Sequence, residues 1–246
     1  MNKQKSNKKQ NRSSLRIMII SLGLMIVLLT VTLAMFTSGD LVTNRFSGGR
    51  VDISIIEPNR DYEDGLNVVP GEIIEKDPYV VNNEKLDVYV FLKVIVPCDS
   101  DIVIEDDQGD DKGKPLDGIV YPVPLYKFRD QNDYFDPDLN SEQAVNPQWV
   151  LITGYPKVND GNTEYTYVYG YIGNNQESKT LQALSEGQQT SSPLFNSIKV
   201  LNFGEKGFDP NRNYGIKVKA YGIRTEFLNG DMTTNIPSEV WEKIGE

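Results

Sequence analysis

From residue 40 onward, apolar and polar side chains alternate with a period of two, and this pattern constrains the fold more than any other feature. Residues 50–55 (Arg-Val-Asp-Ile-Ser-Ile) place every second side chain on one face, as in a strand with one buried face. Residues 215–223 alternate in the same way. Residues 87–96 are nearly all apolar, which is typical of a central strand covered on both sides. The sequence therefore predicts an all-β fold.

Further patterns complete the predicted elements. Residues 165–172 are aromatic and β-branched, which is a strong strand signal. Weaker strand patterns cover residues 42–47, 72–75, 102–105, 147–152 and 196–202. Residues 237–244 begin with proline and serine and carry apolar side chains at helical spacing, so we expect a short C-terminal helix. Two polar stretches, 106–118 and 130–147, are predicted surface loops. Many short strands joined by turns indicate an antiparallel β-sandwich.

The N-terminus combines a basic head, residues 1–16, with an uncharged apolar segment, residues 17–36. This pattern is typical of a signal peptide, which would be removed near Ala34, Met35 and Phe36. Because 20 helical residues span about 30 Å, a retained membrane anchor is the alternative. In both cases residues 1–35 form the head and membrane segment, and residues 36–246 are expected outside the cytoplasm.

The composition of the exported body excludes several functions. Beyond residue 34 the chain carries 35 acidic and 19 basic side chains, so nucleic acid is not an expected partner. The chain has no histidine, which excludes histidine bases and HExxH zinc sites. The single cysteine, Cys98, follows an apolar run and is predicted to be a buried structural thiol. A reactive or intermolecular thiol is the alternative.

Two groups of acidic residues are candidate calcium ligands, because Ca²⁺ prefers carboxylate oxygens. The first group is Asp99, Asp101, Glu105, Asp106, Asp107, Asp110 and Asp111. The second group is Asp130, Asp133, Asp136 and Asp138. Neither has the spacing of an EF-hand, so solvated loops are favoured and no cofactor is expected. No carboxylate pair stands out for glycoside hydrolysis, which leaves a hydrolase as the least supported class of function.

Four tyrosines alternate along one predicted strand, and alternate side chains share a face. They are Tyr165, Tyr167, Tyr169 and Tyr171. This face either packs in the core or stacks against a sugar ring. The second interpretation would make the protein a monomeric adhesin for glycan or protein, which would also bind through the loops 106–118 and 130–147.

Three blocks, in this order, resemble the TasA/camelysin-type family of exported matrix proteins. The first runs from Ala34 and Phe36 through Asn44-Arg45-Phe46-Ser47-Gly48-Gly49 into the strand at 50–53. The second has Pro70-Gly71, Lys76 and Asn82, similar to the family segment PG-x-x-x-x-K-x-x-x-x-x-N. The third is the strand 216–224 followed by the helix with Trp241, and residues 188–198 are similar to a linker of that group.

The resemblance implies a jelly-roll-like β-sandwich and an atypical, SipW-dependent signal peptide that a dedicated ER-type signal peptidase removes. It also implies a role in fibres of the extracellular matrix or at the cell surface, with copies of the same chain or other surface proteins as partners. Some family members are described as metalloproteases, but this sequence has no metal-binding motif and no histidine, so no enzymatic activity is expected. Several family members donate the N-terminal strand of the mature chain to a neighbouring subunit. Here the assembly segment would be residues 36–49, with Phe36, Leu41, Val42, Asn44 and Phe46. In the alternative interpretation, residues 40–56 form the first strands of their own sheet.

Overall fold

The computed structural model describes part of the chain, in residues 51–59, 69–106, 112–138, 142–204, 212, 214–228 and 235–244. The chain divides into two units, residues 1–40 and 41–246, and all described residues belong to the second. Four predicted features lie outside the described residues: the segment 17–36, the cleavage region, the assembly segment 36–49 and the strand 42–47. Within the described ranges, no helix has the length and apolar character needed to cross a membrane.

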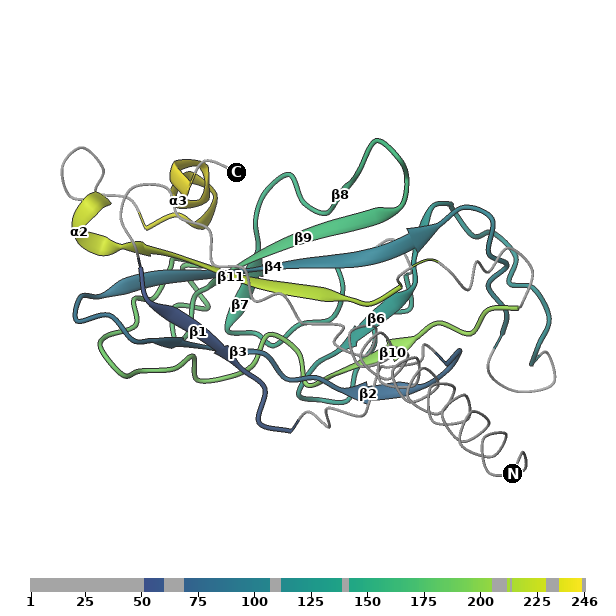
Figure 1. The fold of residues 1–246 in the computed structure, drawn as a ribbon, viewed down its shortest axis with the longest axis horizontal. Helices are drawn as coiled ribbons and strands as arrows, with labels where there is room; N and C mark the ends of the chain where they lie inside the picture. Colours follow the sequence, from purple (N-terminus) through teal and green to yellow (C-terminus); the bar gives the residue numbers. More distant parts are fainter. Residues whose placement is uncertain are drawn as a thin grey trace, which may run out of the picture. The chain divides into compact units, whose positions relative to one another are not determined.

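The largest sheet is antiparallel, with strands in the order β11-β4-β9-β7 (Figure 1). These strands are β4 (Val88–Asp99), β7 (Trp149–Leu151), β9 (Glu164–Tyr171) and β11 (Lys217–Arg224). Two short strands extend it, because β5 (Val123–Pro124) pairs with β4 and β8 (Lys157–Val158) pairs with β9. On β4, Leu92 packs into the main core and Phe91 into a second cluster. The predicted central strand with two covered faces is therefore confirmed.

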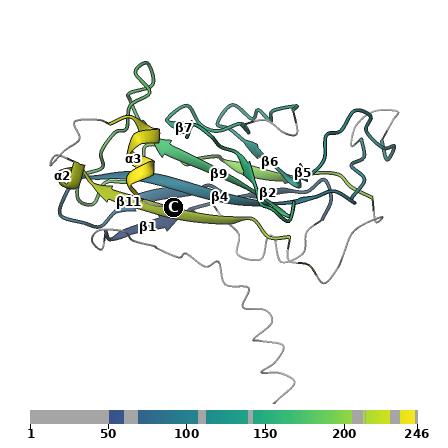
Figure 2. The same ribbon diagram turned by 90° about the horizontal axis from the view of Figure 1, so that it is seen from above.

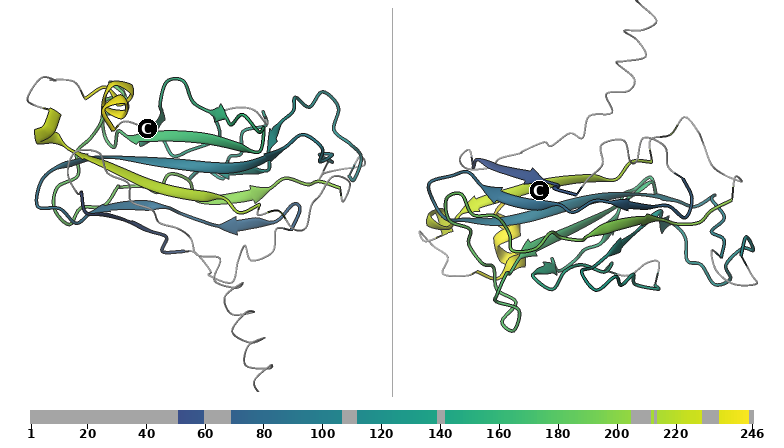
Figure 3. Two further views of the ribbon diagram at one scale, coloured as in Figure 1. Left: turned by 45° about the horizontal axis from the view of Figure 1, so that its top comes forward. Right: turned by 90° about the horizontal axis from the view of Figure 1, so that it is seen from below.

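Two smaller antiparallel sheets complete the main core. One pairs β1 (Ile53–Ile56) with β3 (Tyr79–Asn82), and the other has the order β2 (Ile73–Glu75), β10 (Ser197–Val200), β6 (Tyr126–Arg129). Figure 3 shows these strands on one side of the layer formed by β4, β9 and β11. Side chains from both sides share one buried cluster, among them Val80, Phe128, Ile198, Leu92 and Tyr167. The predicted all-β antiparallel fold is confirmed at this level.

A helix covers the other face of the large sheet. Helix α3 (Pro237–Ile244) has the bounds that the sequence predicts, and a short helix, α2 (Thr225–Leu228), follows β11 directly. Val240, Trp241 and Ile244 of α3 pack into the second cluster with residues of β4, β9 and β11. Figure 2 shows α3 lying against these strands.

The structure corrects the predictions in two places. The pattern at 102–105 forms only isolated bridges, Ile104 with Phe203 and Glu105 with Pro115, instead of a strand. The predicted surface loop 130–147 is wrong at its end, because Gln143, Ala144 and Asn146 are buried. Strands β3, β5, β6 and β8 were also not predicted as separate elements. In contrast, residues 112–118 of the other predicted loop are exposed.

Candidate assembly edge

Strand β1 is the first described strand after the predicted assembly segment, and it lies beside β11. A Cβ atom at Gly222 of β11 would meet Val51 Cγ1 at 3.1 Å, Ile53 Cδ1 at 3.2 Å and Val88 Cγ1 at 2.9 Å. The glycine therefore permits this close approach. Strand β1 bonds to β3 of the same chain, with Ile53 opposite Asn82. The interpretation in which these residues form the first strand of a sheet of their own chain is thus confirmed for residues 53–56.

Strand β11 presents an open edge beside β1. The main-chain N–H of Thr225 donates to the carbonyl oxygen of Asp87 at 3.0 Å, so these two residues form a hydrogen-bonded pair. In an antiparallel register such pairs alternate with pairs that are not hydrogen-bonded, so the main-chain groups of every second residue of β11 point away from β4. These outward positions include Val218, Ala220 and Gly222. In the described part of the chain β11 pairs with β4 alone, and no hydrogen-bond partner is seen for the outward groups of these three residues. We call residues 218–222 the open β11 edge.

An ion pair fixes the end of β11 beyond this edge. The Arg224 guanidinium donates to both carboxylate oxygens of Glu84, at 2.9 and 3.0 Å. This hydrogen bond lowers the pKa of Glu84 below its ordinary value. Because Glu84 follows β3, the pair joins the sheet of β11 to the sheet of β1 and β3.

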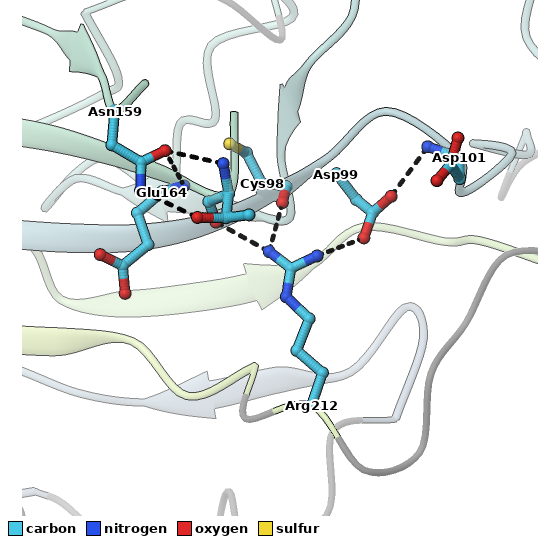
Figure 4. Close-up of polar contacts among 7 residues, drawn as sticks. Cys98, Asp99, Asp101, Asn159, Glu164 and Arg212 are labelled. Carbon is cyan, nitrogen blue, oxygen red and sulfur yellow. Dashed lines mark hydrogen bonds and ion pairs between the residues drawn. The ribbon is translucent and has the colours of Figure 1, made fainter. Parts of the chain in front are cut away.

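At the other end of the large sheet, the guanidinium of Arg212 joins the C-terminal end of β4 to the N-terminal end of β9 (Figure 4). It donates to Asp99 Oδ2 at 2.5 Å, to the carbonyl oxygen of Cys98 at 2.7 Å and to that of Thr163 at 2.8 Å. The turn before β9 is held by Asn159, whose Oδ1 accepts the N–H of Thr163 at 2.8 Å. This cluster satisfies main-chain carbonyls at the sheet end, so its role is to hold the fold.

The structure gives the predicted calcium ligands other partners. Asp99 binds Arg212, and it also accepts the N–H of Asp101 at 2.8 Å. In the second group, Asp130 accepts the N–H of Tyr134 within a turn. Among the described residues, no three Cys, Asp or Glu side chains gather as a metal site requires. Three members of the first group lie outside the described residues: Asp107, Asp110 and Asp111. Calcium binding by either group therefore stays an untested alternative to the solvated loops that the sequence favours.

The four alternating tyrosines share one face, as predicted, and that face points into the core. Tyr167, Tyr169 and Tyr171 are at most 1% exposed, and Tyr165 packs against the same cluster. The rings of Tyr167 and Tyr169 stack with centroids 6.3 Å apart. Burial raises the pKa of both hydroxyls. A sugar cannot reach this face, so the glycan-stacking interpretation is wrong for this strand.

Lys76 and Asn82, from the segment that begins at Pro70-Gly71, stabilise the packing of the strands. Lys76 Nζ lies 2.7 Å from Glu57 Oε1, and the two side chains are only 7% and 11% exposed. Asn82 is fully buried, donates to the carbonyl oxygens of Leu86 and Leu184, and accepts the N–H of Glu84. Buried polar groups with such partners fix the chain path. This spacing therefore specifies a strand-and-turn structure.

Cys98 is a buried free thiol, as predicted. Burial raises its pKa to about 12. Since only the thiolate attacks disulfides, we expect the folded protein at pH 8 to react with an aromatic disulfide reagent only as fast as it unfolds. Addition of denaturant should release one thiol per chain. Rapid stoichiometric labelling of the folded protein, measured by absorbance, would contradict this prediction.

Two important residues of this region were missed by the sequence reasoning. Gly222 stands inside an otherwise continuous strand, a position that often marks a close backbone approach, so a signal for it existed. Arg212 lies in a polar stretch and offers no comparable signal. Comparisons of the chain with protein-family models, curated proteins and solved structures found no match.

Proposed function

We propose that this protein is an exported, non-enzymatic structural protein of the cell surface or extracellular matrix, and that it assembles through its N-terminal segment. In this proposal the signal peptide is removed near Ala34 to Phe36, and residues 36–49 of one copy pair with the open β11 edge of the next. The jelly-roll arrangement, the signal peptide and the likeness to the TasA/camelysin type belong to the proposal as well.

The open β11 edge is the observation that carries the proposal. Outward main-chain groups at Val218, Ala220 and Gly222 have the alternating spacing that an added strand requires. An edge that has no partner strand among the described residues favours pairing with another chain. Because β1 already pairs with β3, residues 53–56 cannot serve as the donated strand.

The assembly segment is long enough to reach a neighbour. Fifteen residues, 36–50, precede the described part of the chain, and a fully extended segment of that length spans roughly 50 Å. Leu41, Val42 and Phe46 supply apolar side chains that can be buried on an acceptor. Cleavage near residue 36 would release this segment from the membrane, which couples export to assembly.

The proposal is tested by comparing a chain of residues 36–246 with one that begins at Gly49. Residues 41–246 form a compact unit with their own core, so the body can be studied without residues 1–35. We expect sedimentation to show concentration-dependent polymers for the longer chain and monomers for the shorter one, with fibres in electron micrographs of the longer chain only. Two chains that both stay monomeric at high concentration would refute the proposal.

A matched pair of proline variants locates the acceptor edge. Val218→Pro removes an N–H that faces outward, so it blocks strand addition without removing a bond to β4. Leu151→Pro makes the same change on the opposite edge of the same sheet. We expect only Val218→Pro to stop polymerisation, with circular dichroism unchanged in both. Continued polymerisation of folded Val218→Pro would exclude this edge as the acceptor.

A further inference from the structure

The opposite edge of the large sheet, strand β7, is also open. The N–H of Ile172 donates to the carbonyl oxygen of Gln148, and the N–H of Ile152 donates to the carbonyl oxygen of Val168. Hydrogen-bonded residues alternate along an antiparallel pair, so the main-chain groups of Val150, midway between Gln148 and Ile152, also point toward β9. The main-chain groups of Leu151 and the carbonyl oxygen of Trp149 therefore face away from the sheet. Over the described ranges, no hydrogen-bond partner is seen for these outward groups.

A cavity of about 340 Å³ lies directly along this edge. Its lining is largely apolar and includes Val145, Trp149, Leu151, Tyr169 and Ile172. Sites that bind ligands commonly have this size and this mixture of apolar lining with a few polar groups. The outward main-chain groups of β7 supply a donor and two acceptors at its wall. The combination of an open strand edge and an adjoining apolar cavity matches the way extended peptides are recognised.

Opposite charges lie at the two ends of this cavity. The carbonyl oxygen of Glu142 accepts the hydroxyl of Tyr169, and Tyr169 is the register partner of Leu151, which places Glu142 near the end of β7. Lys179 belongs to the turn after Ile172, which places it near the start of β7. Both residues line the cavity, and both side chains are exposed. The site therefore has an acidic end and a basic end.

Two residues that line the cavity have backbone conformations that residues with a Cβ atom rarely adopt. Gln143 and Lys179 have φ angles of 69° and 51°, in the left-handed region. Gln143 is held there because its Oε1 accepts the N–H of Phe128, on the edge strand β6. This bond satisfies the outward main-chain N–H of Phe128 at the edge of the neighbouring sheet. Strained residues of this kind tend to gather at binding sites.

We propose that the β7 edge and its cavity bind an extended peptide, which pairs antiparallel to β7. A basic side chain near the N-terminus of the peptide meets Glu142, an apolar side chain enters the cavity, and an acidic side chain near the C-terminus meets Lys179. The main-chain bonds supply affinity, and the two charges set the direction. This site is separate from the open β11 edge, and the proposal does not depend on polymer formation.

The probe is an acetylated and amidated peptide, Lys-Thr-Val-Thr-Glu, whose first, third and fifth side chains share the face toward the cavity. Amide hydrogen exchange is measured by NMR on residues 49–246, which contain every described strand. With the peptide at about ten times its dissociation constant, only about one site in ten is free, so exchange at Leu151 should slow about tenfold. The amide of Val150, already bonded to β9, serves as an internal control. No slowing at Leu151 with about 10 mM peptide would overturn the proposal.

Charge reversal tests the predicted direction. The reversed peptide, Glu-Thr-Val-Thr-Lys, should bind the unmodified protein at least about threefold more weakly, since each end then meets a like charge. Lys179→Glu should weaken binding of the first peptide by a similar factor, measured by fluorescence anisotropy. Lys112→Glu makes the same charge change at an exposed residue outside the cavity lining and should leave binding unchanged. Equal binding of both peptides would contradict the antiparallel assignment.

The two proline variants separate this site from the assembly edge. Leu151→Pro removes the outward N–H of β7 and should abolish peptide binding, whereas Val218→Pro should leave it intact. Polymerisation should show the opposite pattern. If folded Leu151→Pro still binds the peptide, β7 is not the binding edge, whatever the result for assembly.

Discussion

Trp241→Ala is expected to lower the free energy of unfolding by about 3–5 kcal/mol, the usual cost of removing a buried aromatic side chain. Trp241 is 3% exposed on helix α3. Its ring centroid lies 5.3 Å from that of Phe91 on β4 and 5.3 Å from that of Tyr221 on β11. Its indole N–H also donates to the hydroxyl of Tyr155 at 3.4 Å. One side chain thus joins the helix to two strands of the large sheet.

The chain provides a direct measurement of this effect. It contains two tryptophans, and the second, Trp149, lies in the main core on the other side of the sheet. In Trp241→Ala, the fluorescence of Trp149 during urea unfolding therefore reports the main core alone. Glu242→Ala, an exposed change on the same helix, is the control and should cost less than about 0.5 kcal/mol. A cost below about 1 kcal/mol for Trp241→Ala would mean that α3 contributes little to the fold.

The elements that the sequence predicted well are those whose local pattern of apolar side chains or of proline determines their structure. Strand β4 is apolar on both faces because a core lies on each side, and its neighbour β11 alternates around Ala220 and Tyr221, which enter different clusters. The start of α3 at Pro237 follows from the restricted φ of proline. Local rules and tertiary packing agree at these positions, so a single sequence is sufficient.

The elements that were missed depend on partners far along the chain. Strand β6 is four residues long and is defined by pairing with β10, about 70 residues away. Gln143 is buried in a polar stretch because its amide caps Phe128 and donates to the hydroxyl of Tyr167. A glutamine between Glu142 and Ala144 gives no local sign of such a role. Both open edges were likewise invisible, since an edge is a property of the whole sheet.

Lys76→Met is expected to lower the free energy of unfolding by about 3–5 kcal/mol, which matches the effect of Trp241→Ala for a different physical reason. The substitution retains much of the side-chain volume but leaves the carboxylate of Glu57 without the ammonium group 2.7 Å away. Since both side chains are nearly inaccessible, water cannot replace the lost partner. The stability is measured by urea unfolding at pH 7.

A second ion pair of the same type provides the control. Lys217 Nζ lies 3.0 Å from Glu164 Oε1, but these side chains are 51% and 38% exposed. Lys217→Met should therefore cost less than about 1 kcal/mol, because water screens the pair and solvates the carboxylate that remains. The two variants remove the same chemical group at similar distances and differ mainly in burial. Equal costs would show that burial does not determine the effect at Lys76.

The double variant Lys76→Met/Glu57→Leu separates the charge from the packing. Because the double variant removes both charges of this pair, we expect it to recover most of the stability lost in Lys76→Met, with a coupling energy of at least about 2 kcal/mol. Such a result would show that the lysine of the PG-x-x-x-x-K-x-x-x-x-x-N segment stabilises the fold through its ion pair with Glu57. The same segment ends at Asn82, whose amide closes the next turn, so both polar positions would then be explained by the path of the chain around β1 and β3. A double variant that is less stable than Lys76→Met would instead assign the stability to contacts of each side chain with other parts of the core.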